Sequence, residues 1–460
     1  MTFLPPALLH RLDVPGPRYA CYPTADRFVE AFGADDYALA LSQRRGGPAA
    51  RALPLSLYVH IPFCESSCHY CGCTKLVTRH HERGTAYLHD LAREIGLQAA
   101  QLQRREPVAQ LHLGGGTPTF LSDTELGALM ALLRHHFTLL PGGDYSIGVD
   151  PRTVDRRRLA FLAGAGFNRL GFGVQDADPR VQQAIHRPQP QAQVAALVEQ
   201  ARAAGFAVVD VDLLYGLPLQ SPASFERTLA QLLALRPDRI SLHAYGHRPE
   251  RVKSQRRIAA AELPPVEARL EMLTHALAAL AGAGYEHIGL DQFALAGDPL
   301  ALARRQGRLH RNFQGYSTQP EGDLIGLGLS AIGRIGAVYG QNARSLEEYH
   351  DHLERGRLPV TRGLALGRDD LARRGVIMAL MCHGQLLFES IELAWLLDFR
   401  SHFAAELRQL ELLAAEGLVR LDDAGIEVTA IGRHLIRSVV RVFDRYLQAD
   451  LARERFSGII

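Results

Sequence analysis

One strand-and-helix unit recurs along this chain and restricts the folds that it can adopt. At three places a helical segment ends in Ala-Gly before an aromatic residue and a strand-like segment follows, at Ala165-Gly166-Phe167, Ala204-Gly205-Phe206 and Ala283-Gly284-Tyr285. Glycine suits the residue after a helix because that position often needs a positive φ. Parallel strands need a long crossover connection, which a helix usually supplies. The repeated unit therefore predicts a parallel sheet.

The predicted strands cover residues 55–61, 109–113, 144–149, 169–174, 207–214 and 239–243. One intervening helix begins at the capping box Ser122-Asp-Thr-Glu125, whose Ser and Glu side chains satisfy free backbone N–H groups. This pattern alone fits both a partial barrel and an open doubly wound sheet. In either fold the chemistry belongs at the carboxyl ends of the strands.

Four of the six cysteines lie within ten residues, directly after the first predicted strand. Cys64, Cys68 and Cys71 have the spacing Cys-x3-Cys-x2-Cys, and Cys73 follows. Three thiolates are one too few to close a tetrahedral metal site. A [4Fe–4S] cluster bound by three thiolates keeps one iron free for a ligand that is not protein. The spacing therefore favours an iron–sulfur cluster with an open iron.

A zinc site is the alternative for these thiols, with His60, His69 or Cys73 as the fourth ligand. The isolated Cys21 and Cys382 are interpreted as ordinary buried thiols, because free cysteine is among the most buried residue types.

The residues around the thiols resemble a known family. Tyr70-Cys71-Gly72-Cys73, with Pro17-Arg18-Tyr19 and Tyr22-Pro23-Thr24 upstream, is similar to the oxygen-independent coproporphyrinogen III oxidases (coproporphyrinogen dehydrogenases) of the radical S-adenosylmethionine (SAM) superfamily. Further motifs match in the family's order, at Gly114-Gly-Gly-Thr-Pro-Thr119, Gly173-Val-Gln-Asp176, Asp212-Leu-Leu-Tyr-Gly-Leu-Pro218 and His310-Arg-Asn-Phe-Gln-Gly-Tyr316. With these motifs, zinc becomes the weaker interpretation.

The resemblance implies an α/β fold, a partial (β/α)6 radical-SAM barrel with a small C-terminal helical, winged-helix-like domain. We expect an N-terminal extension that packs on the active site, a catalytic domain and a C-terminal domain, over residues 1–50, 51–363 and 364–460. The elements predicted in the last domain are helices near 368–383, 390–416 and 430–447 and strands over 418–421 and 426–429.

An activity is implied as well. An electron from the cluster would cleave SAM to a 5′-deoxyadenosyl radical, which removes a hydrogen atom from a propionate of coproporphyrinogen III. Loss of CO2 and of an electron then leaves a vinyl group, and two rounds give protoporphyrinogen IX in haem biosynthesis. The cofactors implied are a [4Fe–4S] cluster and SAM, two molecules per chain. The partners implied are the porphyrinogen and an electron donor such as flavodoxin or ferredoxin.

Site residues are carried over from the matching motifs. The expected metal ligands are Cys64, Cys68 and Cys71, and Cys73 and Tyr58 are expected to take part in catalysis. The expected cofactor-binding residues are Tyr58, Gly115, Gly116, Thr117, Gly148, Gln175, Arg187, Asp212, Gly246 and Ile332. Arg187 would face the SAM carboxylate in a charge-assisted pair, and Asp212 would accept hydrogen bonds from SAM hydroxyls.

The substrate's four propionates call for cationic partners. Arg18, His310 and Arg311 lie in matching motifs and are the candidates, with structural ion pairs as the alternative interpretation.

One position departs from the family in a way that matters for SAM. The family typically has Ser-Ile-Glu-Val-Asp-Pro after the third strand, where this chain has Ser146-Ile-Gly148-Val-Asp150-Pro151. The missing Glu would bind SAM, so we expect weakened SAM use or none. Asp150 lies on the same strand face and could compensate in part, unless it is committed elsewhere. Smaller departures are Ala177, where an aromatic is usual, and Gln292, where the family has His.

Composition excludes some classes of function. The net charge of +2 gives no electrostatic case for nucleic-acid binding. No apolar run reaches the roughly 18 residues of a membrane span, and Met1 to His10 does not resemble a signal peptide. Clustered cysteines fit a reducing cytoplasm, and the family suggests a monomer.

Two other functions stay open at this point. A non-catalytic, haem-binding relative of this fold would bind haem stably without cleaving SAM. A zinc-structured regulatory protein that used its C-terminal domain on DNA would contain zinc in place of iron.

Overall fold

A curved 12-stranded sheet forms the centre of the computed structural model, which describes residues 6–12, 16–44, 53–102 and 104–449. Its order is β16-β15-β14-β13-β1-β4-β5-β6-β7-β8-β10-β9. The central strands are β1 (Leu55–Ile61), β4 (Pro107–Gly115), β5 (Thr138–Val149), β6 (Arg169–Gln175), β7 (Val208–Tyr215) and β8 (Arg239–Ala244). Each pairs in parallel with the next. The predicted strands and their parallel arrangement are confirmed.

Strands that the pattern did not predict extend the sheet on both sides. β13 (Leu324–Leu327) pairs in parallel with β1, and an antiparallel series follows it. The added strands are β14 (Ile332–Ile335), β15 (Val338–Asn342) and β16 (Val360–Ala365) beyond β13, and β10 (Gln292–Leu295) and β9 (Tyr285–Gly289) beyond β8. These strands are short, so their sequences carry too few alternations to reveal them.

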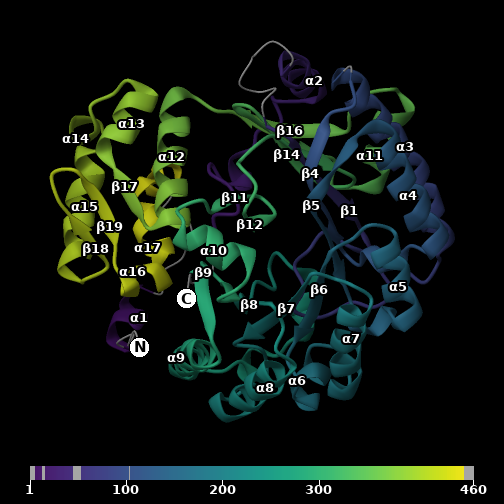
Figure 1. Ribbon diagram of the computed structural model, residues 1–460, viewed down its shortest axis with the longest axis horizontal. Helices are drawn as coiled ribbons and strands as arrows, with labels where there is room; N and C mark the ends of the chain where they lie inside the picture. Colours follow the sequence, from purple (N-terminus) through teal and green to yellow (C-terminus); the bar gives the residue numbers. More distant parts are fainter. Residues whose placement is uncertain (1–5, 13–15, 45–52, 103, 450–460) are drawn as a thin grey trace.

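Helices cover the outer side of the sheet (Figure 1). They are α3 (Glu82–Leu102), α4 (Asp123–His136), α5 (Arg156–Gly164), α6 (Pro179–Ala184), α7 (Gln191–Ala203), α8 (Pro222–Leu235) and α9 (Val266–Gly282). The glycines of the repeated unit, Gly166, Gly205 and Gly284, have φ values of 105°, 94° and 84°, as predicted. The predicted capping box also forms, since the Ser122 side chain accepts from the Glu125 N–H and Glu125 accepts from the Ser122 N–H.

The C-terminal region forms a second hydrophobic core, separate from that of the sheet. Its elements are α12 (Arg368–His383), β17 (Gln385–Leu387), α13 (Phe388–Trp395), α14 (Phe399–His402), α15 (Ala404–Ala415), β18 (Val419–Leu421), β19 (Gly425–Val428), α16 (Ala430–His434), α17 (Ile436–Val440) and α18 (Arg445–Ala449). The first predicted helix and the hairpin are present, and β17 adds an unpredicted third strand.

Two single helices predicted in this region are wrong. The segment 390–416 is interrupted because Leu396, with φ of 51°, ends α13, and Asp398 caps a new helix by accepting from the Ser401 N–H. The segment 430–447 is divided at Leu435 and again at Asp444. Helical spacing of apolar residues persists across these breaks, which explains the prediction.

The N-terminal segment joins the two parts of the molecule. Leu8 and Leu9 of α1 (Pro6–Leu12), together with Tyr19 and Tyr22, belong to the C-terminal hydrophobic core. Figure 1 shows α1 beside that region. By contrast, α2 (Ala34–Gln43) packs with the core of the sheet. The domain boundary expected between residues 50 and 51 lies outside the described residues.

Polar contacts link the C-terminal region to the turn between β9 and β10. The carboxylate of Asp291 accepts from Arg437 of α17 at 2.5 Å and lies 3.0 Å from the Nδ1 atom of His243. The ring of His287 stacks on that of His434, with centroids 4.5 Å apart. Burial lowers the pKa of His287 to about 3 and that of His434 to about 4.

Among the described helices, none combines the length and the apolar character that crossing a bilayer requires.

The histidine pair predicts a pH dependence of stability. Both histidines are held neutral when folded, whereas an unfolded histidine gains its proton near pH 6.5. The unfolded state therefore binds more protons below about pH 6.5, and the free energy of unfolding falls as pH is lowered towards 4. We expect His434→Phe, which keeps an aromatic ring in the stack, to lose less stability between pH 7.5 and 5.5, by up to about 1.4 kcal/mol per pH unit. Denaturant unfolding at both pH values measures this difference.

His80→Gln is the control, because His80 is 77% exposed and should leave the pH dependence as it is in the parent protein. Equal losses for the parent and His434→Phe would contradict the assignment.

Candidate active site

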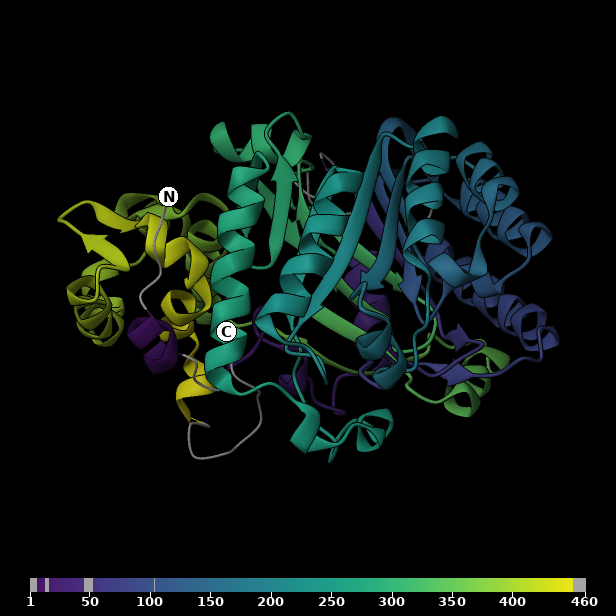
Figure 2. The same cartoon turned by 90° about the horizontal axis from the view of Figure 1, so that it is seen from below.

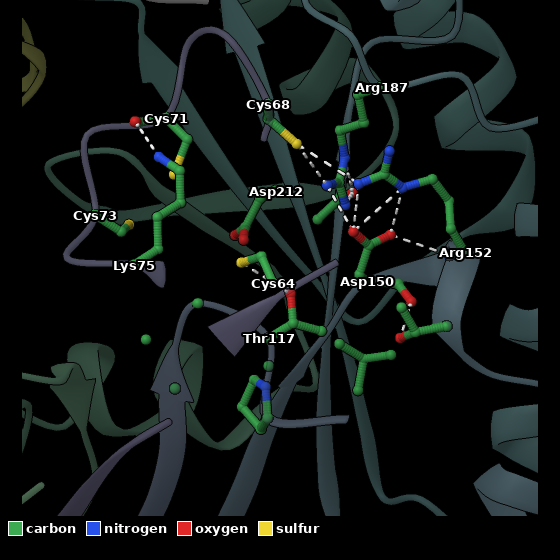
Figure 3. Close-up of a pocket in the computed structure, with 18 of the residues that line it drawn as sticks. Cys64, Cys68, Cys71, Cys73, Lys75, Thr117, Asp150, Arg152, Arg187 and Asp212 are labelled. Atoms are coloured by element: carbon green, nitrogen blue, oxygen red, sulfur yellow. Dashed lines mark hydrogen bonds and ion pairs between the residues drawn. The ribbon is translucent and has the colours of Figure 1, made fainter. Parts of the chain in front are cut away.

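A pocket of about 490 Å³ lies at the carboxyl ends of the parallel strands (Figure 3). The predicted site residues that line it are Cys64, Cys68, Cys71, Cys73, Gly115, Gly116, Thr117, Gly148, Gln175, Arg187 and Asp212. These residues come from β2 (Phe63–Cys64), the loop before β3 (Leu76–Val77), the carboxyl-terminal parts of β4 to β7, and the connection between α6 and α7, which carries Arg187. The fold thus brings most of the predicted site residues together.

The cysteine loop places its thiols around one end of the pocket. Cys64 receives a hydrogen bond from the Thr117 hydroxyl at 3.4 Å, and burial nevertheless raises the pKa of Cys64 to about 11. A hydrogen bond from the Cys73 thiol, helped by the Lys75 ammonium, lowers the pKa of Cys71 to about 5 against the effect of burial. These contacts favour the thiolate of Cys71, which is the form that binds metal. The same hydrogen bond raises the pKa of the Cys73 thiol.

Two guanidinium groups face the third thiol. Arg187 donates to the Sγ atom of Cys68 at 3.3 Å, and Arg152 lies 3.6 Å from the same sulfur. Both arginines also bind the carboxylate of Asp150, Arg187 at 2.9 Å and Arg152 at 2.7 Å. Figure 3 shows this group on the side of the pocket opposite Cys71 and Cys73.

This network decides the role of Asp150. Burial alone would raise the pKa of Asp150, but the hydrogen bond from Arg152 and the charge of Arg187 outweigh it, and the pKa is lowered. The carboxylate is therefore charged and held by two arginines. It is committed to the pocket wall, so it is not free to replace the glutamate that the family has at position 148.

Position 148 itself is open. A Cβ atom on Gly148 would meet only the carbonyl oxygen of Leu113, at 3.8 Å. Its register partner on β6 is Gly171, which also leaves open space above it. The strand thus has room for a side chain that this sequence does not supply.

The glycine-rich loop after β4 is packed closely against the cysteine loop. A Cβ atom on Gly116 would lie 2.7 Å from the Phe63 carbonyl oxygen and 3.0 Å from the Cys64 sulfur. Gly115 has φ of 111°, a region that favours glycine, and a Cβ there would lie 2.8 Å from the Ile61 oxygen. The loop backbone therefore forms one wall of the pocket because its residues lack side chains.

Gln175 and Asp212 occupy neighbouring strand ends. Gln175 has φ of 71°, uncommon for a residue with a side chain, and such strain tends to persist at functional sites. Asp212 is partly buried, and desolvation raises the pKa of its carboxyl group against the effects of His243 and of a hydrogen bond from Ser241. Both side chains are therefore held at the pocket by the sheet.

Tyr58 lies beside the pocket without lining it. His60 can only donate from Nε2 to the Thr74 carbonyl at 2.9 Å, so its Nδ1 accepts from the Tyr58 hydroxyl at 3.0 Å. The Tyr58 ring stacks on His112, with centroids 5.9 Å apart.

The remaining predicted site residues lie elsewhere. The carbonyl of Gly246 accepts from Gln255, and Ile332 lines a small separate cavity with Tyr22 and Arg311. Arg18 donates to the Ala244 carbonyl at 2.6 Å, near the end of β8, whereas Arg311 is buried and donates to the Tyr19 carbonyl. His310, the third propionate candidate, is half-buried at the start of β11 (His310–Asn312).

The residues present fit an iron–sulfur cluster with SAM. A cubane cluster bonds each thiolate to a different iron, so its protein ligands surround a space wider than one ion. Three cysteines border a pocket that has cationic groups, a bare glycine loop and a buried carboxylate.

Comparison with known proteins agrees with this geometry. Residues 58–232 match the model of the radical SAM superfamily, and residues 366–435 match the HemN C-terminal domain. Two relatives carry the name oxygen-independent coproporphyrinogen III oxidase. The one from Pseudomonas aeruginosa is 48% identical and covers 98% of both chains, and the one from Escherichia coli is 44% identical and covers 99% of this chain and 98% of its own. This chain belongs to the oxygen-independent coproporphyrinogen III oxidase family.

The solved coproporphyrinogen III oxidase (HemN) from Escherichia coli, described as a radical SAM enzyme, extends the likeness to three dimensions. It is 44% identical, has a TM-score of 0.89, and the match covers 93% of this chain and 97% of that one. The predicted α/β radical-SAM fold is confirmed. Family membership also implies a [4Fe–4S] cluster and SAM as the cofactors.

The prediction from sequence missed several residues that line this pocket, including one arginine, one lysine and one histidine. Arg152 follows Asp150 by two positions, and Lys75 and His112 also line the wall. Lys75 had a signal, because it is one of only two lysines in the chain and lies two residues after Cys73. Nothing in the sequence distinguished Arg152 from the many other arginines of the chain.

The glycine wall predicts a difference between two matched variants. Gly116→Ala would force a methyl group against the Phe63 oxygen and the Cys64 sulfur, whereas Gly148→Ala would meet no close atom. We expect Gly116→Ala to bind less than half of the iron and acid-labile sulfide of the parent after anaerobic reconstitution, and Gly148→Ala to bind as much as the parent. Full cluster content in Gly116→Ala would show that the loop moves aside without cost.

Proposed function

We propose that this chain carries out the oxidative decarboxylation of two propionates of coproporphyrinogen III, giving protoporphyrinogen IX. The observation that carries the proposal is the pocket of three cysteines, glycine loop and buried charges at the strand ends, in a chain that matches the family along its length. Its relatives' names supply the substrate. The [4Fe–4S] cluster and SAM, when bound, would supply a 5′-deoxyadenosyl radical that removes a hydrogen atom from the propionate.

In this proposal Cys64, Cys68 and Cys71 hold the cluster, and the Thr117 hydroxyl and Lys75 support them. Thr117 donates to the Cys64 sulfur at 3.4 Å, and Lys75 fixes the loop by donating to the Cys71 carbonyl at 2.6 Å. A hydrogen bond with Cys71 raises the pKa of the Cys73 thiol, which supports a role for Cys73 as a proton-carrying group near the substrate.

SAM would lie along the glycine loop, with Gly115, Gly116 and Thr117 presenting backbone to it. Gln175 and Asp212 would bind polar groups of SAM from the ends of β6 and β7. The Arg187 guanidinium is already paired with Asp150, so a SAM carboxylate would share a positive charge that Arg152 reinforces. We assign Tyr58, which stacks on His112, to the support of this wall.

A second SAM and the propionates would occupy the region beyond the pocket. Gly246 and Ile332 are the proposed contacts of the second SAM. Arg18, His310 and Arg311 are the proposed partners of the propionates. Arg18 lies within electrostatic reach of Asp291 and Arg437, which supports a charged site there. Arg311 is buried whereas Arg18 is exposed, so Arg18 is the stronger candidate.

We further propose that the chain acts as a monomer in the cytoplasm, where its thiols stay reduced. The division at residues 50 and 363 is also a proposal, and the two separate hydrophobic cores support its second boundary.

Gly148 should weaken SAM binding in this protein. A charge-assisted hydrogen bond is worth about 1.5–3 kcal/mol, or roughly ten- to over a hundredfold in affinity. Since Asp150 is held by two arginines, it does not restore that bond. We therefore propose that this enzyme has a high KM for SAM.

A glutamate at position 148 tests both the proposed reaction and the weakened binding of SAM. We expect Gly148→Glu to bind SAM at least about tenfold more tightly than the parent, with faster 5′-deoxyadenosine release and porphyrinogen conversion at low SAM. Gly148→Gln, equal in size and uncharged, should recover less. The proteins would be purified anaerobically with the cluster reconstituted, and assayed with a strong chemical reductant.

Conversion by the parent would establish the activity, and equal SAM affinity in all three proteins would refute the role of position 148. Inactivity of all three, with an intact cluster and bound SAM, would overturn the proposed reaction and favour the non-catalytic, haem-binding alternative.

A further inference from the structure

A strongly basic segment lies outside the cysteine loop, and nothing in the proposed reaction uses it. Residues 247–257, between β8 and α9, have the sequence HRPERVKSQRR, with five basic residues and one acidic residue. The whole chain has a net charge of only +2, so the rest of it is slightly acidic by comparison. We call residues 247–257 the basic segment. Figure 2 shows the chain before α9 projecting from the body of the molecule.

Local packing turns the charges of this segment outward. Residues Lys253–Arg257 form a short 3-10 helix, in which Gln255 is buried and Ile258 follows it into a small apolar cluster. The side chains of Arg251, Lys253, Arg256 and Arg257 are exposed. Glu250 is the single acidic residue of the segment and lies 3.6 Å from Arg248, so the segment keeps a net positive charge.

The basic segment rests directly on the cysteine loop. Ser254 donates to the Cys71 carbonyl at 3.1 Å, and Gln255 donates to the Tyr70 carbonyl at 2.9 Å. Lys75 donates to the same Cys71 carbonyl from the other side, at 2.6 Å. The basic segment is thus in direct contact with Cys71, one of the cysteines of the pocket.

The proposed reaction, on which this inference rests, requires one electron for each SAM that is cleaved. We propose that the basic segment is the docking surface for an acidic one-electron carrier protein, which reduces the cluster through the cysteine loop. In each encounter the carrier loses one electron and the oxidised cluster gains it, and no bond is made or broken. The basic segment suits the docking of an acidic carrier because it has a net positive charge. It also contacts the loop whose cysteines would hold the cluster.

Electrostatics favours a transient protein partner of this kind. Complementary charge raises the rate of encounter more than the affinity, so the carrier can leave after each transfer. Such steering weakens with salt, because the Debye length falls from about 30 Å at 0.01 M to about 8 Å at 0.15 M. Nucleic acid would also be attracted to a basic surface, and the experiment includes it as a competing outcome.

The test compares Lys253→Glu/Arg257→Glu with Arg408→Glu/Arg420→Glu. Both double variants reverse two exposed arginine or lysine charges, and the second pair lies on α15 and β18 of the C-terminal region, far from the pocket (Figure 1). A purified bacterial flavodoxin with an acidic surface serves as the probe. Its binding to each cluster-loaded protein would be measured by calorimetry at low and high salt.

We expect the first variant to weaken flavodoxin binding at least about tenfold at low salt and much less at high salt, and the second to bind as the parent does. SAM cleavage driven by reduced flavodoxin should fall in the first variant alone. Cleavage driven by dithionite, which needs no docking surface, should be the same in all three proteins.

Failure of this inference is distinct from failure of the proposed function. Parent-like flavodoxin binding and flavodoxin-driven cleavage in Lys253→Glu/Arg257→Glu would overturn the docking surface, while dithionite-driven cleavage would still support the enzyme. Tighter binding of a labelled oligonucleotide than of flavodoxin, lost in the same variant, would assign the basic segment to nucleic acid and also overturn the proposal. If the parent cleaved no SAM with either reductant, the proposed function would be rejected. The calorimetry would still show whether the basic segment binds flavodoxin.

Discussion

Parallel pairing of the central strands is the constraint on which the rest of this structure depends. Because β1, β4, β5, β6, β7 and β8 run in one direction, their carboxyl ends meet at one edge. The cysteine loop after β1, the glycine loop after β4 and the carboxylate on β7 therefore face one another, although they are separated by up to about 150 positions in the chain. The close glycine backbone then lets these loops approach within contact distance.

Charge organises the interior of the pocket in two opposed regions. On one side Arg152, Arg187 and Asp150 surround the Cys68 sulfur. On the other, Lys75 and Cys73 favour the thiolate of Cys71. The carboxylate of Asp150 serves this arrangement by pairing with the buried Arg187 and the partly buried Arg152, which explains why it is unavailable for a new task. A buried charge cannot be reassigned without leaving its partners unpaired, at a cost of several kcal/mol. Under the proposed function, the glycine at position 148 would therefore stay uncompensated.

Much of the fold was predictable because it follows from local rules. The central strands, the capping box at Ser122 and the positive-φ glycines each depend on a few neighbouring residues, and the structure confirms them. The elements that were missed or wrongly predicted depend on contacts outside the local sequence. The short flanking strands β13 to β16 form only because a distant strand is there to pair with, and the C-terminal helices are interrupted by turns at Leu396 and Leu435 within patterns that remain helical. Pairing and packing over long separations leave little trace in local sequence.

For the site, sequence alone determined the chemistry that is available. The spacing of Cys64, Cys68 and Cys71, the glycine run after β4 and the absence of a carboxylate at position 148 are properties of the chain itself. Only the tertiary structure decided how those groups are used. It paired Asp150 with two arginines, directed the Tyr58 hydroxyl to His60, and laid the basic segment on the cysteine loop. The physical reason is that hydrogen bonds and ion pairs require contact in space, and folding sets those contacts among residues that the sequence leaves far apart.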